Sequence, residues 1–171
     1  MKNCEEIISL IFPMFEQKKE SRFCEFFTNN KCYEAKEEKR YELMGTEKVK
    51  KIKIVINHQV KSFKELFKYC GCINSIFFKQ FYRINITDMS EMFYGCSLLN
   101  ELNLSNFNTD KVTDMCRMFS RCSSLEELNL YNFNANNVKI ISMLFYGCTS
   151  LKELICSDES IKNQFNNDLI F

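Results

Sequence analysis

The sequence predicts an α/β solenoid, in which a short parallel sheet covers one face, short helices cover the other, and a helical cap closes the N-terminal end. Three observations predict it. A phrase recurs every 26 residues from Lys61 onward. Each copy contains one segment whose apolar residues alternate with period two and another whose apolar residues follow helical spacing. A single copy cannot bury its apolar side chains alone, so the copies are expected to stack.

The repeat is visible as columns of identical or similar residues. Cysteine and phenylalanine each return four times at a spacing of 26, and two columns of Ile or Leu keep the same step. The columns are Cys70, Cys96, Cys122 and Cys148; Phe67, Phe93, Phe119 and Phe145; Ile73, Leu99, Leu125 and Leu151; and Ile76, Leu102, Leu128 and Leu154. Internal repetition of this kind decides the fold class before any other signal.

The strand of each copy is predicted from the pattern L-x-x-L-x-L-x-x-F. In the second copy, Leu102 and Leu104 should face inward and Glu101 outward, because successive strand residues point to opposite faces. An Asn-Phe-Asn phrase follows at residues 106–108 and again at 132–134. Its asparagines are expected to cap turn backbone and to pair with the equivalent Asn one coil away.

A short helix is predicted before each strand. Apolar residues occupy positions i, i+3, i+4 and i+7, which form one face of two helical turns: Met89, Met92, Phe93 and Cys96. Asp88 and Asp114 each stand just before such a segment and are expected to be its N-cap. Each coil is therefore predicted to run from helix through turn to strand.

Changes in the pattern divide the chain into three predicted parts. These are a helical N-terminal cap over residues 1–47, a solenoid of an edge strand and four coils of 26 residues over 48–156, and a C-terminal cap over 157–171. The length of 171 residues with 46% hydrophobic content suffices for a domain with a continuous core.

The N-terminal cap is predicted to contain helices near Glu5–Arg22 and Tyr33–Met44, with Gly45 placed to end the second. The edge strand is predicted at Val49–Ile54, which repeats the strand pattern. Its lysines alternate with apolar residues and should keep the sheet edge from pairing with other chains. This alternation, without interleaved aromatic residues, argues against a nucleic-acid partner.

Charge and cysteine content narrow the class of protein. Net charge is +1, but residues 1–85 carry 17 Lys and Arg against 11 acidic residues, whereas residues 86–171 carry 6 against 11. The N-terminal half is therefore expected to prefer acidic partners and the C-terminal half basic ones. Ten cysteines would suggest disulfides in a secreted chain, but the sequence shows no export signal, lipid-attachment motif or apolar membrane span. It predicts an intracellular protein with reduced thiols.

The cysteine columns admit several interpretations. Neighbouring cysteines could form disulfides or hold a metal, but a buried cysteine is more often a small apolar filler. Cys70-Gly-Cys72 lacks the paired C-x-x-C spacing of a zinc site. His58, the only histidine, has no visible partner that would orient it toward a cysteine nucleophile. We therefore predict no catalytic residue, metal or cofactor, and a protein that is not an enzyme.

At its repeats the chain resembles the BspA-like leucine-rich repeat family, in the 26-residue form found in mycoplasma-type surface lipoproteins. The resemblance covers about residues 60–156 and rests on Val112-Thr-Asp-Met115 with Met118-Phe119, Cys122-Ser-Ser-Leu125, Leu128-Asn-Leu130 and Asn132-Phe133-Asn134. It implies a leucine-rich-repeat solenoid, commonly at a cell surface and associated with adhesion or host-protein binding. It implies no catalytic residues.

The outward strand positions form the candidate binding site. Parallel strands lie about 4.7–4.9 Å apart, so their outward side chains should form columns. One column reads Lys51, Ser75, Glu101, Glu127 and Glu153, and the next reads Lys53, Phe77, Asn103, Asn129 and Ile155. The predicted partner-binding residues are Phe77, Glu101, Asn103, Glu127, Asn129, Tyr131 and Glu153. We expect the module to be a monomer that binds a protein ligand through these residues. The alternative is that they form a solvated surface with no ligand.

A second hypothesis is an intracellular adaptor. Glu6-Ile-Ile-Ser-Leu-Ile-Phe12 looks like the start of the helical F-box that precedes leucine-rich repeats in ubiquitin-ligase adaptors. The resemblance covers only those residues. It implies that residues 1–44 bind a ligase scaffold while the repeats bind a substrate.

Overall fold

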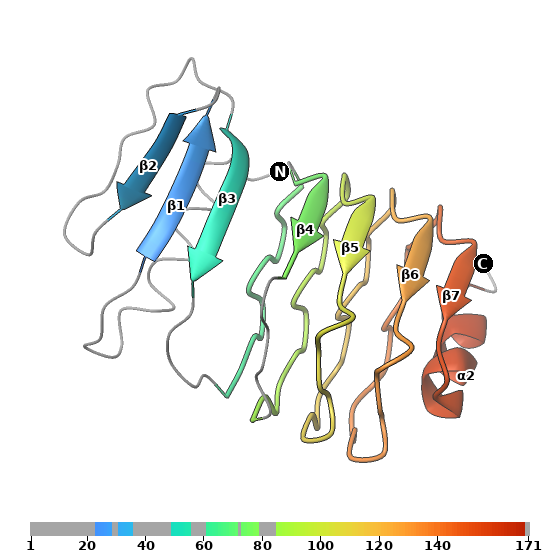
Figure 1. The fold of residues 1–171 in the computed structure, drawn as a ribbon. Coiled ribbons are helices and arrows are strands. Elements are labelled where there is room, and N and C mark those ends of the chain that lie inside the picture. Colours follow the sequence, from blue (N-terminus) through green and yellow to red (C-terminus); the bar gives the residue numbers. More distant parts are fainter. Residues whose placement is uncertain are drawn as a thin grey trace. The chain divides into compact units, whose positions relative to one another are not determined.

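The structure, a computed structural model, describes residues 23–28, 31–35, 49–55, 61–71, 73–78 and 85–169. They fall into two compact units, one that holds β1 to β3 and one that holds residues 61–169 (Figure 1). The elements are β1 (Phe23–Thr28), β2 (Lys31–Ala35), β3 (Val49–Val55), β4 (Ser75–Phe77), β5 (Glu101–Asn103), β6 (Glu127–Asn129), β7 (Glu153–Ile155) and α2 (Glu159–Asp168).

The first unit contains an antiparallel sheet with the strand order β2-β1-β3. The predicted helix at Tyr33–Met44 is wrong at its start, because Tyr33 lies in β2 and pairs with Phe26. Aromatic and β-branched residues fill β1 and β3, which favours strands. The predicted helix at Glu5–Arg22 and the F-box-like segment lie outside the described residues.

The predicted edge strand at Val49–Ile54 exists as β3, but its neighbour is not the one expected. It pairs antiparallel with β1, with Ile52 opposite Phe26 and Lys51 opposite Phe27. The expectation that Lys51 and Lys53 extend the outward columns of the repeat sheet is therefore wrong. β1 supplies backbone hydrogen bonds to β3, whereas the first strand of the repeats was expected to supply them.

The second unit stacks four turns of chain, which we call coils 1 to 4 and which carry β4, β5, β6 and β7 in that order (Figure 1). Parallel bridges join equivalent positions of successive coils at Ser62, Asp88, Asp114 and Ile140. β4 pairs with β5 and β6 with β7, each in parallel. β5 and β6 are neighbours without being paired, so the strand face consists of two short sheets rather than one.

The segment before each strand, which we call the turn segment, is not the predicted helix. Among the described residues of the coils, the N–H of Phe93 donates to the carbonyl of Met118 in the next coil (2.9 Å), whereas the N–H of Cys96 donates to Phe93 in its own coil (3.1 Å). Helical bonds would all stay within one segment. Left-handed backbone, which interrupts a helix, occurs at Glu65, Tyr69, Glu91, Gly95, Arg117, Arg121, Met143 and Gly147.

The apolar spacing of the turn segments nevertheless places their side chains in the core. Met89, Met92, Phe93 and Cys96 are fully buried. The phenylalanine rings of successive coils stack with centroids 5.6, 5.7 and 5.8 Å apart. Every buried cysteine from coil 2 onward donates its thiol to a phenylalanine carbonyl of the preceding coil, at 3.1, 3.2 and 3.0 Å. Rings and thiols therefore form two continuous columns through the stack.

The predicted caps act on turns rather than on helices. Asp88 Oδ1 accepts from the N–H of Ser90 at 2.9 Å, and Asp114 Oδ1 accepts from the N–H of Cys116 at 2.8 Å. The asparagines also bind turn backbone, as expected. Asn132 Nδ2 donates to the backbone carbonyl of Ser105 (2.7 Å) rather than to an equivalent asparagine. Asn134 Nδ2 donates to the carboxylate of Asp110, so the expected pairing between equivalent asparagines does not occur at these positions.

α2 lies against coil 4 and is fixed by an aspartate at each end. Asp158 caps its N-terminus and also accepts from the N–H of Ala135 at 2.7 Å. Asp168 Oδ2 accepts from the N–H of Phe145 at 2.9 Å. The ring of Phe165 meets the ring of Phe145 edge to face, with centroids 5.5 Å apart. α2 thus ends the ring column with a perpendicular aromatic contact.

Truncation of a core leucine should destabilise the stack, whereas truncation of its outward neighbour should not. Leu128 is 1% exposed, and Leu128→Ala is expected to cost about 2–5 kcal/mol of unfolding free energy. Glu127→Ala, one residue earlier on the same strand, should stay within about 0.5 kcal/mol of the parent chain. Urea unfolding measures both, and equal losses would contradict the assignment of inward and outward faces.

Candidate functional site

The strand face brings the predicted site residues together in pairs. Ser75 lies opposite Glu101 and Phe77 opposite Asn103 in the first short sheet. In the second, Glu127 lies opposite Glu153, and Asn129 lies opposite Ile155. The predicted column register is confirmed within each sheet. The side chain of Phe77 lies outside the described part of the structure, so only its strand position is known.

Three exposed glutamates form the acidic column: Glu101, Glu127 and Glu153. None of them forms an ion pair within the described residues. The nearby pair between Lys152 Nζ and Glu126 Oε2 (3.1 Å) is so exposed that water screens most of its attraction. The acidic column therefore presents carboxylates that no described cation neutralises by direct contact.

The asparagines of the next column are partly committed to the fold. Asn103 Oδ1 accepts from the N–H and the hydroxyl of Ser105, at 3.0 and 2.7 Å. Asn129 Oδ1 accepts from the N–H of Tyr131 at 3.0 Å. Each bond holds the backbone as it leaves a strand. The amide oxygens are thus structural, which weakens the prediction that these two residues contact a partner.

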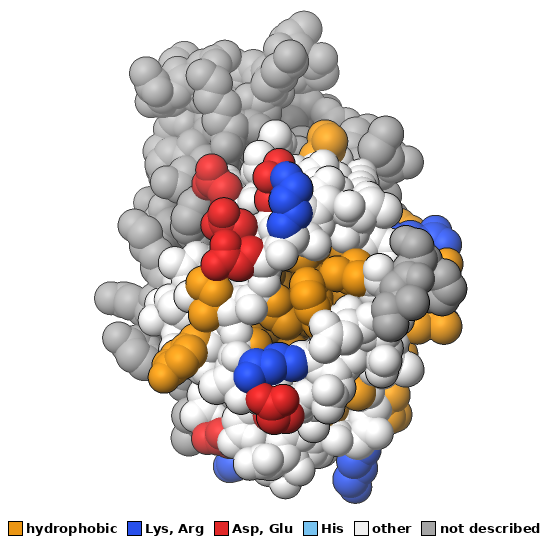
Figure 2. Space-filling view, turned by 90° about the vertical axis from the view of Figure 1, so that its right-hand side faces the viewer, with side chains coloured by type: hydrophobic (Ala, Val, Ile, Leu, Met, Phe, Trp, Pro, Cys, Tyr) orange, Lys and Arg blue, Asp and Glu red, His pale blue; other side chains and the backbone are white. Residues whose placement is uncertain are grey.

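Two exposed apolar side chains stand beside the acidic column. Tyr131 is 64% exposed, and its backbone is held on both sides, because Asn129 accepts from its N–H and Ser157 donates to its carbonyl. Ile155 is 44% exposed but was not among the predicted site residues. Its place opposite Asn129 in an outward column could have identified it. Figure 2 shows acidic and hydrophobic side chains close together at the C-terminal end of the stack.

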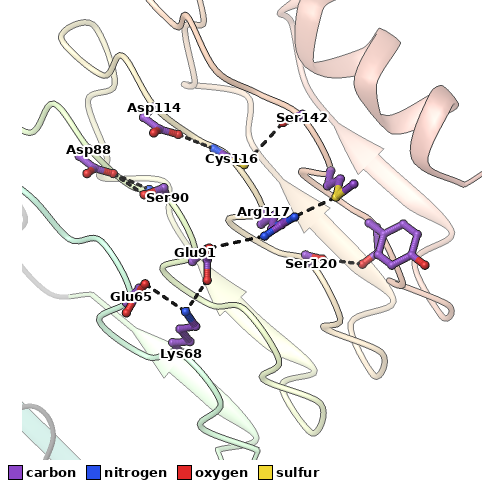
Figure 3. A network of polar contacts seen from close by, with 12 residues as sticks. Glu65, Lys68, Asp88, Ser90, Glu91, Asp114, Cys116, Arg117, Ser120 and Ser142 are labelled. Carbon is purple, nitrogen blue, oxygen red and sulfur yellow. Dashed lines mark hydrogen bonds and ion pairs between the residues drawn. The ribbon is translucent and has the colours of Figure 1, made fainter.

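The turn segments carry a chain of polar contacts that crosses all four coils (Figure 3). Lys68 Nζ pairs with Glu65 (3.0 Å) and Glu91 (2.6 Å), Glu91 approaches Arg117 at 3.9 Å, and Arg117 Nε donates to the sulfur of Met143. Partial burial alone would lower the pKa of Lys68, but the hydrogen bonds to Glu91 and Glu65 raise it overall. The two lysine and arginine charges and the two glutamate charges of this chain of contacts therefore offset one another.

The buried thiols have the chemistry of fillers rather than of nucleophiles. Burial raises the pKa of Cys122 well above its ordinary value and the pKa of Cys148 to about 12. The cysteines of the described coils are free thiols, and within the described residues no cluster of His, Cys, Asp and Glu could hold a metal. His58 lies outside the described residues. A protonated thiol donating to a carbonyl is a poor nucleophile.

The range of the coils is also the range of a family match. The family model described as "Mycoplasma protein of unknown function, DUF285" matches residues 61–169, which hold all four coils and α2. Neither a curated protein nor a solved structure matches the chain. None of the helices that the structure describes has the length and apolarity required to cross a bilayer.

Alkaline pH should weaken the fold through the buried thiols. The pKa of Cys148 is about 12 in the folded chain against 9.0 ordinarily, so the unfolded chain loses this proton first as pH rises. Its contribution is present below about pH 9 and is lost toward pH 12. Urea unfolding between about pH 7 and 10.5 should show a falling free energy, and Cys148→Ala should flatten that dependence. Identical pH dependence in both chains would contradict this account.

Proposed function

Because the chain belongs to the family described as Mycoplasma protein of unknown function, DUF285, whose description gives no activity, we propose its function from the strand face. In this proposal the four coils are a leucine-rich-repeat solenoid of the BspA-like kind. The solenoid is a non-enzymatic module that binds a protein partner. The repeat spacing of 26 residues and the L-x-L strands support this classification.

The observation that carries the proposal is the acidic column beside exposed apolar side chains. Glu127 and Glu153 lie in register with no paired cation among the described residues, and Tyr131 and Ile155 stand next to them. A mixture of exposed charge and an aromatic anchor is typical of protein interfaces. A partner with a basic patch whose positive groups lie about 4.8 Å apart would match the column.

The rigidity of the frame supports binding by preorganisation. Backbone bonds fix the strands, and Asn129 and Ser157 fix the main chain on both sides of Tyr131. Little ordering entropy is then lost when a partner binds. The buried thiols donate to backbone carbonyls, and Lys68 and Glu91 pair with each other, which favours a binding role over catalysis. An adhesion-like role is the form of binding that the family resemblance favours.

Removal of the two central side chains of the site should abolish partner binding without loss of fold. The double substitution Glu127→Ala and Tyr131→Ala is expected to keep the melting temperature, because both side chains are exposed. Affinity capture from cell extract and from the surface fraction should lose the partner that the parent chain retains.

The matched control takes the same two residue types from elsewhere, with Glu159→Ala and Tyr146→Ala, and should retain the partner. Loss of the partner from both double variants, or a lowered melting temperature in the strand-face variant alone, would contradict the proposed site. A partner lost only from a chain that lacks residues 1–44 would favour the adaptor hypothesis instead.

A further inference from the structure

The turn segments carry positive charge that no carboxylate of the fold neutralises by direct contact. They hold six Lys and Arg against four Asp and Glu, over residues 61–70, 87–96, 113–122 and 139–148. The glutamates pair with Lys68 and Arg117, and the aspartates accept backbone N–H groups. Four cations form no ion pair within the described residues: Lys61, Lys64, Arg121 and Lys139. The exposed side of the turn segments, which we call the turn face, is therefore basic, whereas the strand face is acidic.

Arg121 is exposed and lies over an aromatic ring rather than beside a carboxylate. Its guanidinium carbon is 5.7 Å from the centroid of the Tyr94 ring. The ring of Tyr69, which is 43% exposed, meets the ring of Tyr94 edge to face with centroids 5.1 Å apart. A guanidinium over a ring keeps the N–H donors at its edge, and these donors match a carboxylate in a bidentate pair. We call Tyr69, Tyr94 and Arg121 the tyrosine-arginine cluster.

Two members of the tyrosine-arginine cluster stand where the backbone favours glycine. Equivalent positions of the four coils hold Tyr69, Gly95, Arg121 and Gly147, with φ of 61°, 72°, 62° and 75°. Left-handed backbone of this kind suits glycine and costs other residues free energy. Coils 2 and 4 follow that preference, whereas coils 1 and 3 do not. Such strain concentrates at functional sites, so these two side chains are candidates for a role other than folding.

The glycines of the even coils make room for these large side chains. A Cβ on Gly95 would lie 2.7 Å from Cδ1 of Tyr69, and a Cβ on Gly147 would lie 3.4 Å from Cγ of Arg121. Each large side chain therefore packs against the glycine of the following coil. The alternation of a large residue with glycine holds both side chains in place on the turn face, so little ordering entropy is lost when a partner binds.

We propose that the turn face binds an acidic segment of a partner protein through the tyrosine-arginine cluster. Arg121 takes a carboxylate of the partner, and the rings of Tyr69 and Tyr94 contact its apolar side chains. Charge selects this partner, because the unpaired cations of the turn face attract carboxylates and repel a basic segment. Tyrosine and arginine are also enriched at the centres of protein interfaces. The inference is independent of the strand-face proposal, which concerns another surface and a basic partner.

The experiment titrates the isotope-labelled full chain with a capped peptide of alternating glutamate and phenylalanine, followed by NMR. The backbone amide and the side-chain Nε–H of Arg121 should shift and reach saturation. Binding should weaken about tenfold in Arg121→Gly, because a charge-assisted hydrogen bond is lost. This variant carries the residue that coils 2 and 4 have at the same position, so its melting temperature should stay the same or rise. Arg121→Lys keeps the charge without the bidentate fork and should bind with intermediate affinity.

The matched control removes a cation and a tyrosine from the strand side, with Lys152→Ala and Tyr131→Ala, and should bind the acidic peptide as the parent chain does. A peptide of alternating lysine and phenylalanine should leave the Arg121 resonances in place. Because that peptide probes the strand face, the two proposals can fail separately. Arg121 resonances that the acidic peptide does not move overturn the present one. So does equal binding by Arg121→Gly and the parent chain, and so does a lowered melting temperature of Arg121→Gly, which would make Arg121 a residue of the fold.

Discussion

The forward hydrogen bond between turn segments is the interaction on which the rest of this structure depends. It joins a residue to the carbonyl 25 positions later, as from Phe93 to Met118, and it recurs at alternate residues. A buried backbone N–H must find an acceptor, and here the next coil supplies it. Coil length is fixed as a result. Ring stacking, the thiol contacts and the outward columns all follow from keeping equivalent residues aligned.

Much of the core could be predicted from the sequence, because burial depends on spacing and the columns of Phe, Cys and Leu have a constant spacing. The backbone of the turn segments could not. Glycine marks two of its left-handed positions, Gly95 and Gly147, but the earlier left-handed position of each coil holds Glu91, Arg117 or Met143, which give no such signal. The same apolar spacing suits a helix in isolation. Tertiary hydrogen bonds to the following coil decide between the two.

The sequence likewise predicted which residues of the site lie side by side, but not every contact that their side chains make. Outward alternation gave the pairing of Glu127 with Glu153, since register within a parallel pair follows from the repeat. It could not show that the amide oxygens of Asn103 and Asn129 hold the departing chain, because that depends on where each strand ends. Nor could the spacing of β3 show its partner, since an alternating strand suits either an antiparallel or a parallel neighbour.

The thiol column has a consequence for how such a chain can change in length. Each cysteine reaches a carbonyl 29 residues earlier, as Cys122 does at Phe93, so every coil carries both the donor for its predecessor and the acceptor for its successor. Duplication of a whole unit of 26 residues then creates a junction that already fits. An insertion of any other size within a coil would shift rings, thiols and carbonyls out of line at once. Recombination can therefore add or remove coils of this stack in steps of one 26-residue unit.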